Sequence, residues 1–358
     1  MTASERIKPP SRRRRRRVPA VTIHDVAARA GVSVATVSRV LNGKELVREE
    51  TSREVLAAAK SLRYVPNVAA RSLSIRRSQT IGIVLPDVHG EFFSEIIRGI
   101  DVAARRAGYH ILVSGSHSDV REMLEVLETM HGRVDGLIVM APDVPLPSLR
   151  ERLPADLQLV LLNSATGGFD AITIDNYGGA RTMMQHLAEL GHGRVAFIKG
   201  PAQNDDARER LRGFRHAMRA RGAAALRTLE FAGDFTEESG YEAAKLVARQ
   251  RPRPTAIFAA NDAMAIGALS ALADLGIDVP RRMSVAGFDD IPIARYVAPP
   301  LTTIRVDIAE LGRRAFALLL AALAGQGGAP HRQECIGTTL VVRKSSASPR
   351  VRKKGEIS

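Results

Sequence analysis

Residues 21–42 read VTIHDVAARAGVSVATVSRVLN, and this stretch decides the fold of the N-terminal part of the chain. Ile23, Val26 and Ala27 before Gly31, and apolar residues after it, recur at helical spacing, so the stretch predicts two short amphipathic helices that pack on each other. Gly31 supplies the left-handed conformation that branched residues resist. We therefore predict a helix–turn–helix.

The outer face of the second helix carries Ala35, Thr36, Ser38 and Arg39. Small and hydroxyl side chains around one guanidinium let a helix approach base edges in the DNA major groove. The alternative is a helical hairpin that only packs. A solvated helix of that kind usually carries more Lys and Glu, so the pattern favours DNA binding.

Positive charge is concentrated at the two ends of the chain. Residues 1–80 contain 18 Lys and Arg against 6 Asp and Glu, and residues 343–358 contain 6 against 1. The formal net charge is +14, so the body between these ends is slightly acidic. This distribution indicates a polyanion-binding segment joined to a domain that detects another signal.

The 358 residues suffice for a small domain plus one large or two medium domains. Cys335 is the only cysteine and indicates a reducing cytoplasm rather than a disulfide or a catalytic thiol. No run of 18 apolar residues occurs, so we expect no membrane span. Arg12–Arg17 is followed by no apolar core, which argues against an export signal, and we expect residues 1–20 to be a disordered basic arm.

Residues 51–62 predict a third helix that completes a headpiece over residues 21–66. Tyr64-Val65-Pro66 interrupts the helical pattern. Residues 67–73, NVAARSL, then predict a helix of two turns that is too short to be stable alone. We expect this hinge helix to fold only against DNA and a second copy of itself, within a hinge and linker over residues 67–79.

From Ile81 onward, short apolar runs alternate with helical patterns such as Phe92–Ala107 and Tyr177–Leu190. This alternation predicts an α/β fold of parallel sheets flanked by helices on both faces, in two lobes. We place the N-lobe at about residues 80–173 and 306–335, the C-lobe at about 174–305 and 336–345, and a basic disordered tail at 346–358. The predicted strands are IGIVLP, HILVSG, GLIVM, QLVLLN, RVAFIKG, AIFAAN and SVAGFDD.

Several motifs in order give the chain a resemblance to LacI/GalR-family transcription regulators. TIHDVAARAGVSVATVSRVLNG resembles the headpiece of that family and YVPNVAARSL its hinge helix. GHGRVAFIKGP, RERLRGF, TAIFAANDAMAIGAL, VPRRMSVAGFDDIP and PPLTTIR resemble its effector-binding core. The resemblance covers about residues 21–345 and implies a periplasmic-binding-protein-like core behind the headpiece.

The family resemblance implies which residues contact operator DNA. Arg39 would donate two hydrogen bonds to a guanine. Leu73 would be wedged into the minor groove and kink the DNA. The implied contact set is Val34, Ala35 and Arg39 for base edges, Thr22, Thr36, Ser38 and Asn42 for phosphates, and Asn67, Ala70, Arg71 and Leu73 in the hinge helix.

The resemblance also implies an effector site between the lobes. Carboxylate, amide and guanidinium groups suit the hydroxyls of a polyol, and an aromatic ring would stack on its apolar face. A small sugar, sugar acid or nucleoside fits this chemistry. The implied residues are Phe92, Phe93, Arg210, Asn261 and Asp289, with Asn204 and Asp206 near the same cleft. Asp87–Phe93 departs from the family's Asn-Pro before the aromatic pair, because Gly90 and Glu91 precede it here.

Three other classes of function are the alternatives. An enzyme would need a metal-spaced histidine pair, a phosphate-binding glycine loop or an activated nucleophile, and none occurs, so we expect no catalysis and no cofactor. A sugar-binding transport component would lack the basic headpiece, while an architectural DNA-binding protein would need no effector. We expect a repressor that binds double-stranded DNA in the cytoplasm at the nucleoid, as a homodimer that matches a two-fold operator. The C-terminal residues show no heptad, so we expect no tetramer by that route.

Overall fold

The computed structural model describes two compact units, Met1–Ser78 and Gln79–Ser358. Five predicted DNA contacts (Asn42, Asn67, Ala70, Arg71 and Leu73) lie outside the described residues, as do the basic arm and residues 350–358. The described residues are 21–41, 47–64, 78–117, 119–140, 154, 157–164, 168–220, 229–326 and 331–349.

The N-terminal unit contains the predicted helix–turn–helix and a third helix. These are α1 (Ile23–Ala30), α2 (Val34–Leu41) and α3 (Glu49–Ser61). Gly31 ends α1 with a φ of 65°, in the left-handed region that favours glycine. Val26, Val37 and Val55, one from each helix, are fully buried and form the centre of a small core. The two helices of the motif are therefore held by apolar packing against α3.

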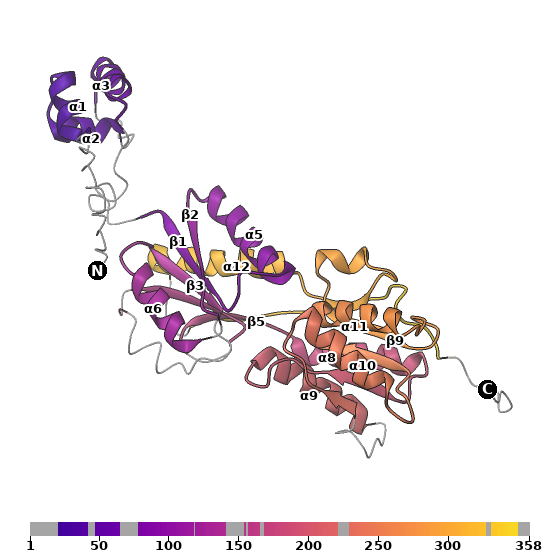
Figure 1. Cartoon of the computed structure of the whole chain (residues 1–358). Coiled ribbons are helices and arrows are strands. Elements are labelled where there is room, and N and C mark those ends of the chain that lie inside the picture. The colour runs from indigo at the N-terminus through magenta and orange to yellow at the C-terminus, as the bar shows by residue number, and fades with distance from the viewer. Residues whose placement is uncertain are drawn as a thin grey trace, which may run out of the picture. The chain divides into compact units, whose positions relative to one another are not determined.

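The second unit contains two six-stranded sheets, which define its N-terminal and C-terminal lobes (Figure 1). The first sheet has the order β11-β5-β4-β3-β1-β2, and all of its strand pairs are parallel. The second has the order β12-β10-β9-β8-β6-β7, in which only β12 pairs antiparallel. The N-terminal lobe uses β1 (Thr80–Leu85), β2 (His110–Gly115), β3 (Gly136–Met140), β4 (Gln158–Leu162), β5 (Asp170–Ile174) and β11 (Gln333–Ile336). The C-terminal lobe uses β6 (Val195–Ile198), β7 (Glu230–Phe231), β8 (Ala256–Ala259), β9 (Ser284–Asp289), β10 (Thr302–Arg305) and β12 (Thr339–Val341).

Helices flank both sheets, as the alternating pattern predicts. The helices expected at Phe92–Ala107 and Tyr177–Leu190 are present and shifted by one residue. The N-terminal lobe carries α5 (Glu91–Arg106), α6 (Val120–Met130) and α12 (Ile308–Ala321), which leads into η3 (Ala322–Gln326). The C-terminal lobe carries α8 (Asn176–Glu189), α9 (Asp205–Arg219), α10 (Glu237–Ala248), α11 (Asp262–Asp274) and the short η2 (Pro292–Arg295). None of the helices in the described part of the chain is long and apolar enough to cross a bilayer.

The chain passes between the lobes three times, after β5, β10 and β11. Helix α12 therefore packs in the N-terminal lobe beside α5, although it lies late in the sequence (Figure 1). Gly99 and Gly312 allow this close approach, because a Cβ at Gly99 would lie 2.1 Å from the carbonyl oxygen of Ala309. Strands β5 and β11 each extend one residue past the lobe boundaries expected from the sequence.

The C-terminal tail does not begin where the sequence predicts it. Ser346 is buried, and its hydroxyl lies 2.9 Å from that of Thr302. The carbonyl of Ala347 accepts hydrogen bonds from His192 and Ser284 at 3.0 and 3.1 Å. The expectation of disorder from residue 346 is therefore wrong for residues 346–349, because hydrogen bonds to the C-terminal lobe hold this polar segment.

Candidate functional site

The outer face of α2 presents the residues predicted to contact DNA. Ala35 and Arg39 are exposed, whereas Thr36 and Ser38 are half-buried. Ser33 caps the helix by accepting a hydrogen bond from the Thr36 amide at 3.1 Å. Val34 is half-buried against the core of the N-terminal unit, so part of its side chain serves packing. This face carries small or polar side chains and one long cationic side chain, a combination that suits a helix in the major groove.

Thr22 lies at the start of α1 and forms a capping box. Its backbone N–H and its hydroxyl both donate to Asp25 Oδ2, at 2.7 and 2.8 Å. These hydrogen bonds stabilise the carboxylate and lower the pKa of Asp25. The exposed position of Thr22 at a helix N-terminus is typical of a phosphate-contacting residue.

Arg210 on α9 is the centre of a buried polar network in the C-terminal lobe. Its guanidinium donates to Asn176 Oδ1 at 2.7 Å and to the carbonyl of Ala260 at 2.6 Å. Nη2 lies 3.0 Å from Asp289 Oδ1, with both side chains over 90% buried. The guanidinium carbon lies 3.9 Å from the centre of the Phe288 ring. The planar cation is thus fixed by bonds in its plane and by an aromatic face against it.

Asp289 is poised as an acceptor at the end of β9. Burial raises its pKa to about 6, although the charge of Arg210 opposes this shift. Arg210 Nη2 lies 3.0 Å from Asp289 Oδ1 as an ion pair, without the alignment of a full hydrogen bond. A ligand hydroxyl would give this buried oxygen a well-aligned donor.

Asp206 links the two lobes. Its Oδ2 accepts a hydrogen bond from Asn163 Nδ2 at 2.6 Å, and its Oδ1 accepts one from Asn176 Nδ2 at 2.7 Å. Asn163 follows β4 of the N-terminal lobe, whereas Asp206 and Asn176 belong to α9 and α8 of the C-terminal lobe. The carbonyl oxygen of the Asn163 side chain is buried and has no donor among the described residues.

Three residues at the ends of β4 and β9 have positive φ angles. Asn163, Asp289 and Asp290 have φ angles of 55°, 113° and 56°. This conformation costs free energy in residues other than glycine, and such residues are concentrated at functional sites. Asp290 itself forms ion pairs with Arg305 and Arg343 at 2.6 Å each, which anchors the segment behind the network.

Asp262 lies directly behind Asp289 and has a structural role. It is fully buried, accepting a 2.5 Å bond from the Thr303 hydroxyl and a 3.0 Å bond from the Ile291 amide. Burial, and then the nearby charge of Asp289, raise the pKa of Asp262 well above its usual value. No group of three or more His, Cys, Asp or Glu in the described ranges could hold a metal ion.

Asn204 and Asn261, both predicted to contact effector, cap helices. Asn204 Oδ1 accepts from the Ala207 amide at 3.0 Å at the start of α9. Asn261 Oδ1 accepts from the Met264 amide at 3.0 Å, and Asn261 Nδ2 donates to the carbonyl of Phe235 at 2.9 Å. Both polar atoms of the Asn261 side chain therefore form hydrogen bonds within the protein. Effector contact by Asn204 and Asn261 stays a prediction.

Phe92 and Phe93 lie in the first turn of α5, in the N-terminal lobe. Their rings pack edge to face with centres 5.7 Å apart, and both rest partly buried against the main core. Gly90 precedes the helix with a φ of 87°, and Glu91 Oε2 accepts a hydrogen bond from the Ile293 amide at 2.8 Å. Because Ile293 belongs to η2 of the C-terminal lobe, the unusual Gly90-Glu91 pair makes a second bond between the lobes.

The structure thus brings three predicted effector residues together, namely Asp206, Arg210 and Asp289. The sequence prediction missed Asn163 and Asn176. The signal for Asn163 was its place at the carboxyl end of a buried parallel strand, where polar groups of a ligand site collect. Asn176 was hidden because Asn at the start of a helix is ordinarily a cap.

Two family models match separate parts of the chain. Residues 22–67 match the model for bacterial regulatory proteins of the lacI family, and residues 184–346 match that for a periplasmic binding protein-like domain. The repressor PurR of Haemophilus influenzae is 35% identical over 333 residues, covering 91% of this chain and 99% of PurR. The regulator GalR of Escherichia coli is 37% identical over 335 residues, covering 92% and 96%.

Two solved structures are similar to most of the chain. The lac repressor dimer bound to operator and the anti-inducer ONPF superposes with a TM-score of 0.83 and 31% identity, covering 92% of this chain and 99% of that one. A regulator from Enterococcus faecium with bound ribose has a TM-score of 0.69 and 25% identity, covering 75% and 99%. The chain therefore belongs to the lacI family of bacterial regulatory proteins.

Proposed function

We propose that this protein is a transcriptional repressor that binds operator DNA as a homodimer and changes its DNA affinity when a small polyol binds between the lobes. The outer face of α2 supplies the DNA-binding chemistry. The relatives named above are repressors and regulators, and one of the similar structures holds operator DNA as a dimer. Effector binding changes DNA affinity through its differential affinity for the two lobe arrangements, typically by about 1–3 kcal/mol.

The observation that carries the effector proposal is a pair of buried acceptors, one from each lobe. Neither Asp289 Oδ1 nor Asn163 Oδ1 receives a well-aligned hydrogen bond from the described residues, although Arg210 Nη2 lies 3.0 Å from the former. Both side chains belong to the network around Arg210. Vicinal hydroxyls of a sugar or nucleoside are donors that would bridge them. Similar structures hold ribose and cellobiose, which places simple sugars first among the ligands to try.

One experiment tests both halves of the proposal. Sequencing the genomic fragments that the purified protein retains should give a palindromic operator, and calorimetry with sugars and nucleosides should give heat for at least one. Heat with no enriched fragment would point to a binding protein without DNA function. An enriched palindrome with no heat for any ligand would favour an effector-independent DNA-binding protein.

Effector affinity is expected to fall as the pH drops through about 6. Asp289 accepts hydroxyl hydrogen bonds in its ionised form, and its pKa of about 6 means that the carboxylate is protonated below that pH. For a sugar identified by the calorimetry, the dissociation constant should rise about tenfold between pH 7 and pH 5. Asp289→Asn should bind weakly at both pH values, and an unchanged pH profile in that variant would contradict the assignment.

Arg39→Ala is expected to relax base preference at one position of each operator half-site. Arg39 is exposed on the outer face of α2, and a bidentate contact to guanine contributes about 1–3 kcal/mol of discrimination. Binding to a set of operators substituted at single positions should reveal one position where the variant no longer discriminates. A uniform loss at all positions would assign Arg39 to a phosphate instead.

Leu73→Ala is expected to weaken specific binding and reduce DNA bending while leaving non-specific affinity nearly intact. Leu73 lies outside the described residues, so this role rests on the family resemblance. Loss of three apolar carbons from a wedge corresponds to about 2 kcal/mol. Fluorescence measurement of the operator bend will check this, and equal losses on specific and random DNA would instead indicate a folding role.

A further inference from the structure

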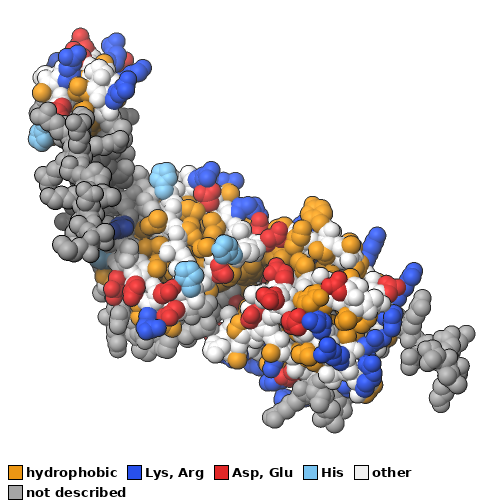
Figure 2. All heavy atoms as spheres, viewed as in Figure 1, with side chains coloured by type: hydrophobic (Ala, Val, Ile, Leu, Met, Phe, Trp, Pro, Cys, Tyr) orange, Lys and Arg blue, Asp and Glu red, His pale blue; other side chains and the backbone are white. Residues whose placement is uncertain are grey.

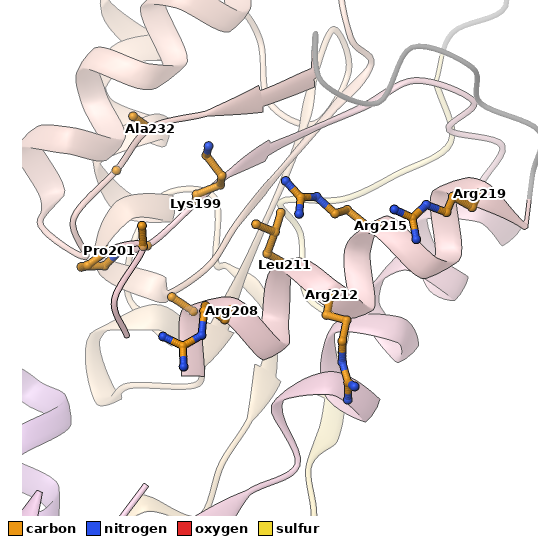
Figure 3. A pocket seen from close by; sticks show the side chains of 12 residues that line it. Lys199, Pro201, Arg208, Leu211, Arg212, Arg215, Arg219 and Ala232 are labelled. Carbon is orange, nitrogen blue, oxygen red and sulfur yellow. The ribbon is translucent and has the colours of Figure 1, made fainter. Parts of the chain in front are cut away.

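A cavity of about 560 Å³ lies in the C-terminal lobe (Figure 3), and its described lining does not include Asp206, Arg210 or Asp289. It is bounded by α9, by the segment that follows β6, and by the residues that follow the edge strand β7. Leu211, Arg215 and Arg219 line it from α9 at spacings of four residues, so one face of that helix forms a wall. Asp206 and Arg210 on the same helix belong to the interlobe network instead.

The cavity carries positive charge that nearby carboxylates do not neutralise. Arg215 donates to both oxygens of Glu230 at 2.7 Å, so this pair is neutral. Within the described residues, Lys199 and Arg219 form no ion pair. In Figure 3 the side chains of Lys199, Arg215 and Arg219 extend toward one side of α9, above Leu211. Two uncompensated cations therefore lie at the wall of one cavity.

Two further arginines of α9, Arg208 and Arg212, also line the cavity, but carboxylates of the same helix neutralise both. Arg208 pairs with Asp205, and Arg212 lies 2.6 Å from Glu209, each with a carboxylate one turn away. Such exposed pairs are common and carry no implication of a ligand. Figure 2 shows Lys and Arg side chains gathered on the visible face of the C-terminal lobe, with Asp and Glu side chains on both lobes.

Apart from its basic side chains, the described lining is small or apolar. Ala207 is buried, Leu211 and Pro201 are half-buried, and Ala232 and Gly233 complete the lining after β7. A volume of this size is within the range of small-molecule sites, which enclose roughly 300–1,000 Å³. An acidic protein would need a broad surface rather than a concave pocket with an aliphatic floor.

We propose that this cavity is a second ligand site that binds a small organic phosphate, with its phosphate held between Lys199 and Arg219 and its carbon body on Leu211. Arginine and lysine are the side chains that hold phosphates, through charge-assisted hydrogen bonds. The backbone N–H of Lys199 donates to the carbonyl of Phe231 at 2.9 Å, which fixes the position from which its side chain starts. A ligand at this site contacts α9, the helix that also carries Arg210, so the core binds a second small molecule.

Lysine acetylation of the full-length protein tests the site directly. Samples are treated with an amine-acetylating reagent alone or with inorganic pyrophosphate, glucose 6-phosphate or glucose, and each lysine is quantified by mass spectrometry. We expect glucose 6-phosphate and pyrophosphate to slow acetylation of Lys199 but not of Lys245, which pairs with Glu242 on α10. Glucose should protect neither lysine.

Two variants make the result specific. Arg219→Gln should raise the concentration for half-protection of Lys199 about tenfold, the equivalent of losing one charge-assisted hydrogen bond. Arg249→Gln removes an exposed cation outside the cavity and should change nothing. The proposal is overturned if neither phosphate protects Lys199 at about 10 mM, or if the phosphates protect Lys199 in Arg219→Gln as well as in the parent.

Discussion

Arg210→Met is expected to lower the free energy of unfolding of the core by about 3–5 kcal/mol and to abolish effector binding. The substitution removes the cation that neutralises Asp289 and leaves a buried carboxylate without its partner, which is among the costliest single changes. It also removes the donors to Asn176 and to the carbonyl of Ala260. Urea unfolding of the full chain and calorimetry with the identified sugar measure the two effects.

Arg208→Met is the matched control for this prediction. Arg208 lies on the same helix, is exposed and pairs with Asp205, so its loss should cost less than about 1 kcal/mol and leave effector binding intact. Arg210→Met combined with Asp289→Asn should recover part of the lost stability without recovering binding, since no buried charge remains. Equal costs for Arg208→Met and Arg210→Met would disprove a structural role for the buried pair.

The pH dependence separates the charge effect from lost packing. The positive charge of Arg210 lowers the pKa of Asp289, so removing it should raise that pKa above about 6. Asp289 is then protonated over a wider range in the folded variant than in its unfolded chain, and the raised pKa stabilises the fold at low pH. The penalty of Arg210→Met should therefore be smaller at pH 5 than at pH 8. A penalty that is the same at both would indicate lost packing alone.

Much of the fold could be predicted because its strongest patterns are local. Gly31 between two apolar stripes specifies the turn of the helix–turn–helix, and runs such as GLIVM and AIFAAN predict buried parallel strands without knowledge of their partners. The strands absent from the prediction, β5, β7, β10, β11 and β12, lack such signals. Gln333–Ile336 alternates in exposure and becomes a strand only by pairing with β5, which lies far back in the sequence. The intrinsic β-propensity of a segment does not reveal which distant strand it will pair with.

The residues of the candidate site could likewise be predicted only in part from the sequence. Asp206, Arg210 and Asp289 were expected in one place, and they meet because the carboxyl ends of parallel strands and the following helices converge there. Asn163 was missed because its role depends on the packing of one lobe against the other. Asn204 and Asn261 show the converse ambiguity, because the same amide that suits a sugar hydroxyl also caps a helix.

Asp206→Ala is expected to weaken effector binding by about tenfold to 100-fold while leaving both lobes folded. Asp206 accepts one hydrogen bond from each of Asn163 and Asn176, and a bond to a charged group contributes about 1.5–3 kcal/mol. The bond from Asn163 exists only when the lobes lie together, so its loss destabilises that arrangement selectively. An effector that binds between the lobes must then supply the missing free energy.

Asp205→Ala supplies a control one residue away on α9. Asp205 pairs with the exposed Arg208, so its removal should change effector affinity by less than about twofold. Asn163→Ala should weaken effector binding at least as much, because it removes the same interlobe bond and also the Oδ1 acceptor proposed for the effector. The double variant should lose less affinity than the sum of the two single losses, since the interlobe bond is counted in both. Additive losses would show that the two residues act independently, and equal affinities for Asp205→Ala and Asp206→Ala would exclude the interlobe bond as a determinant of binding.

Loss of the Asp206 charge should also lower the pKa of Asp289, because that charge raises it. The pH profile of effector binding should therefore move below 6 in Asp206→Ala and stay in place in Asp205→Ala, which distinguishes a change in the site's electrostatics from a general weakening of the lobe.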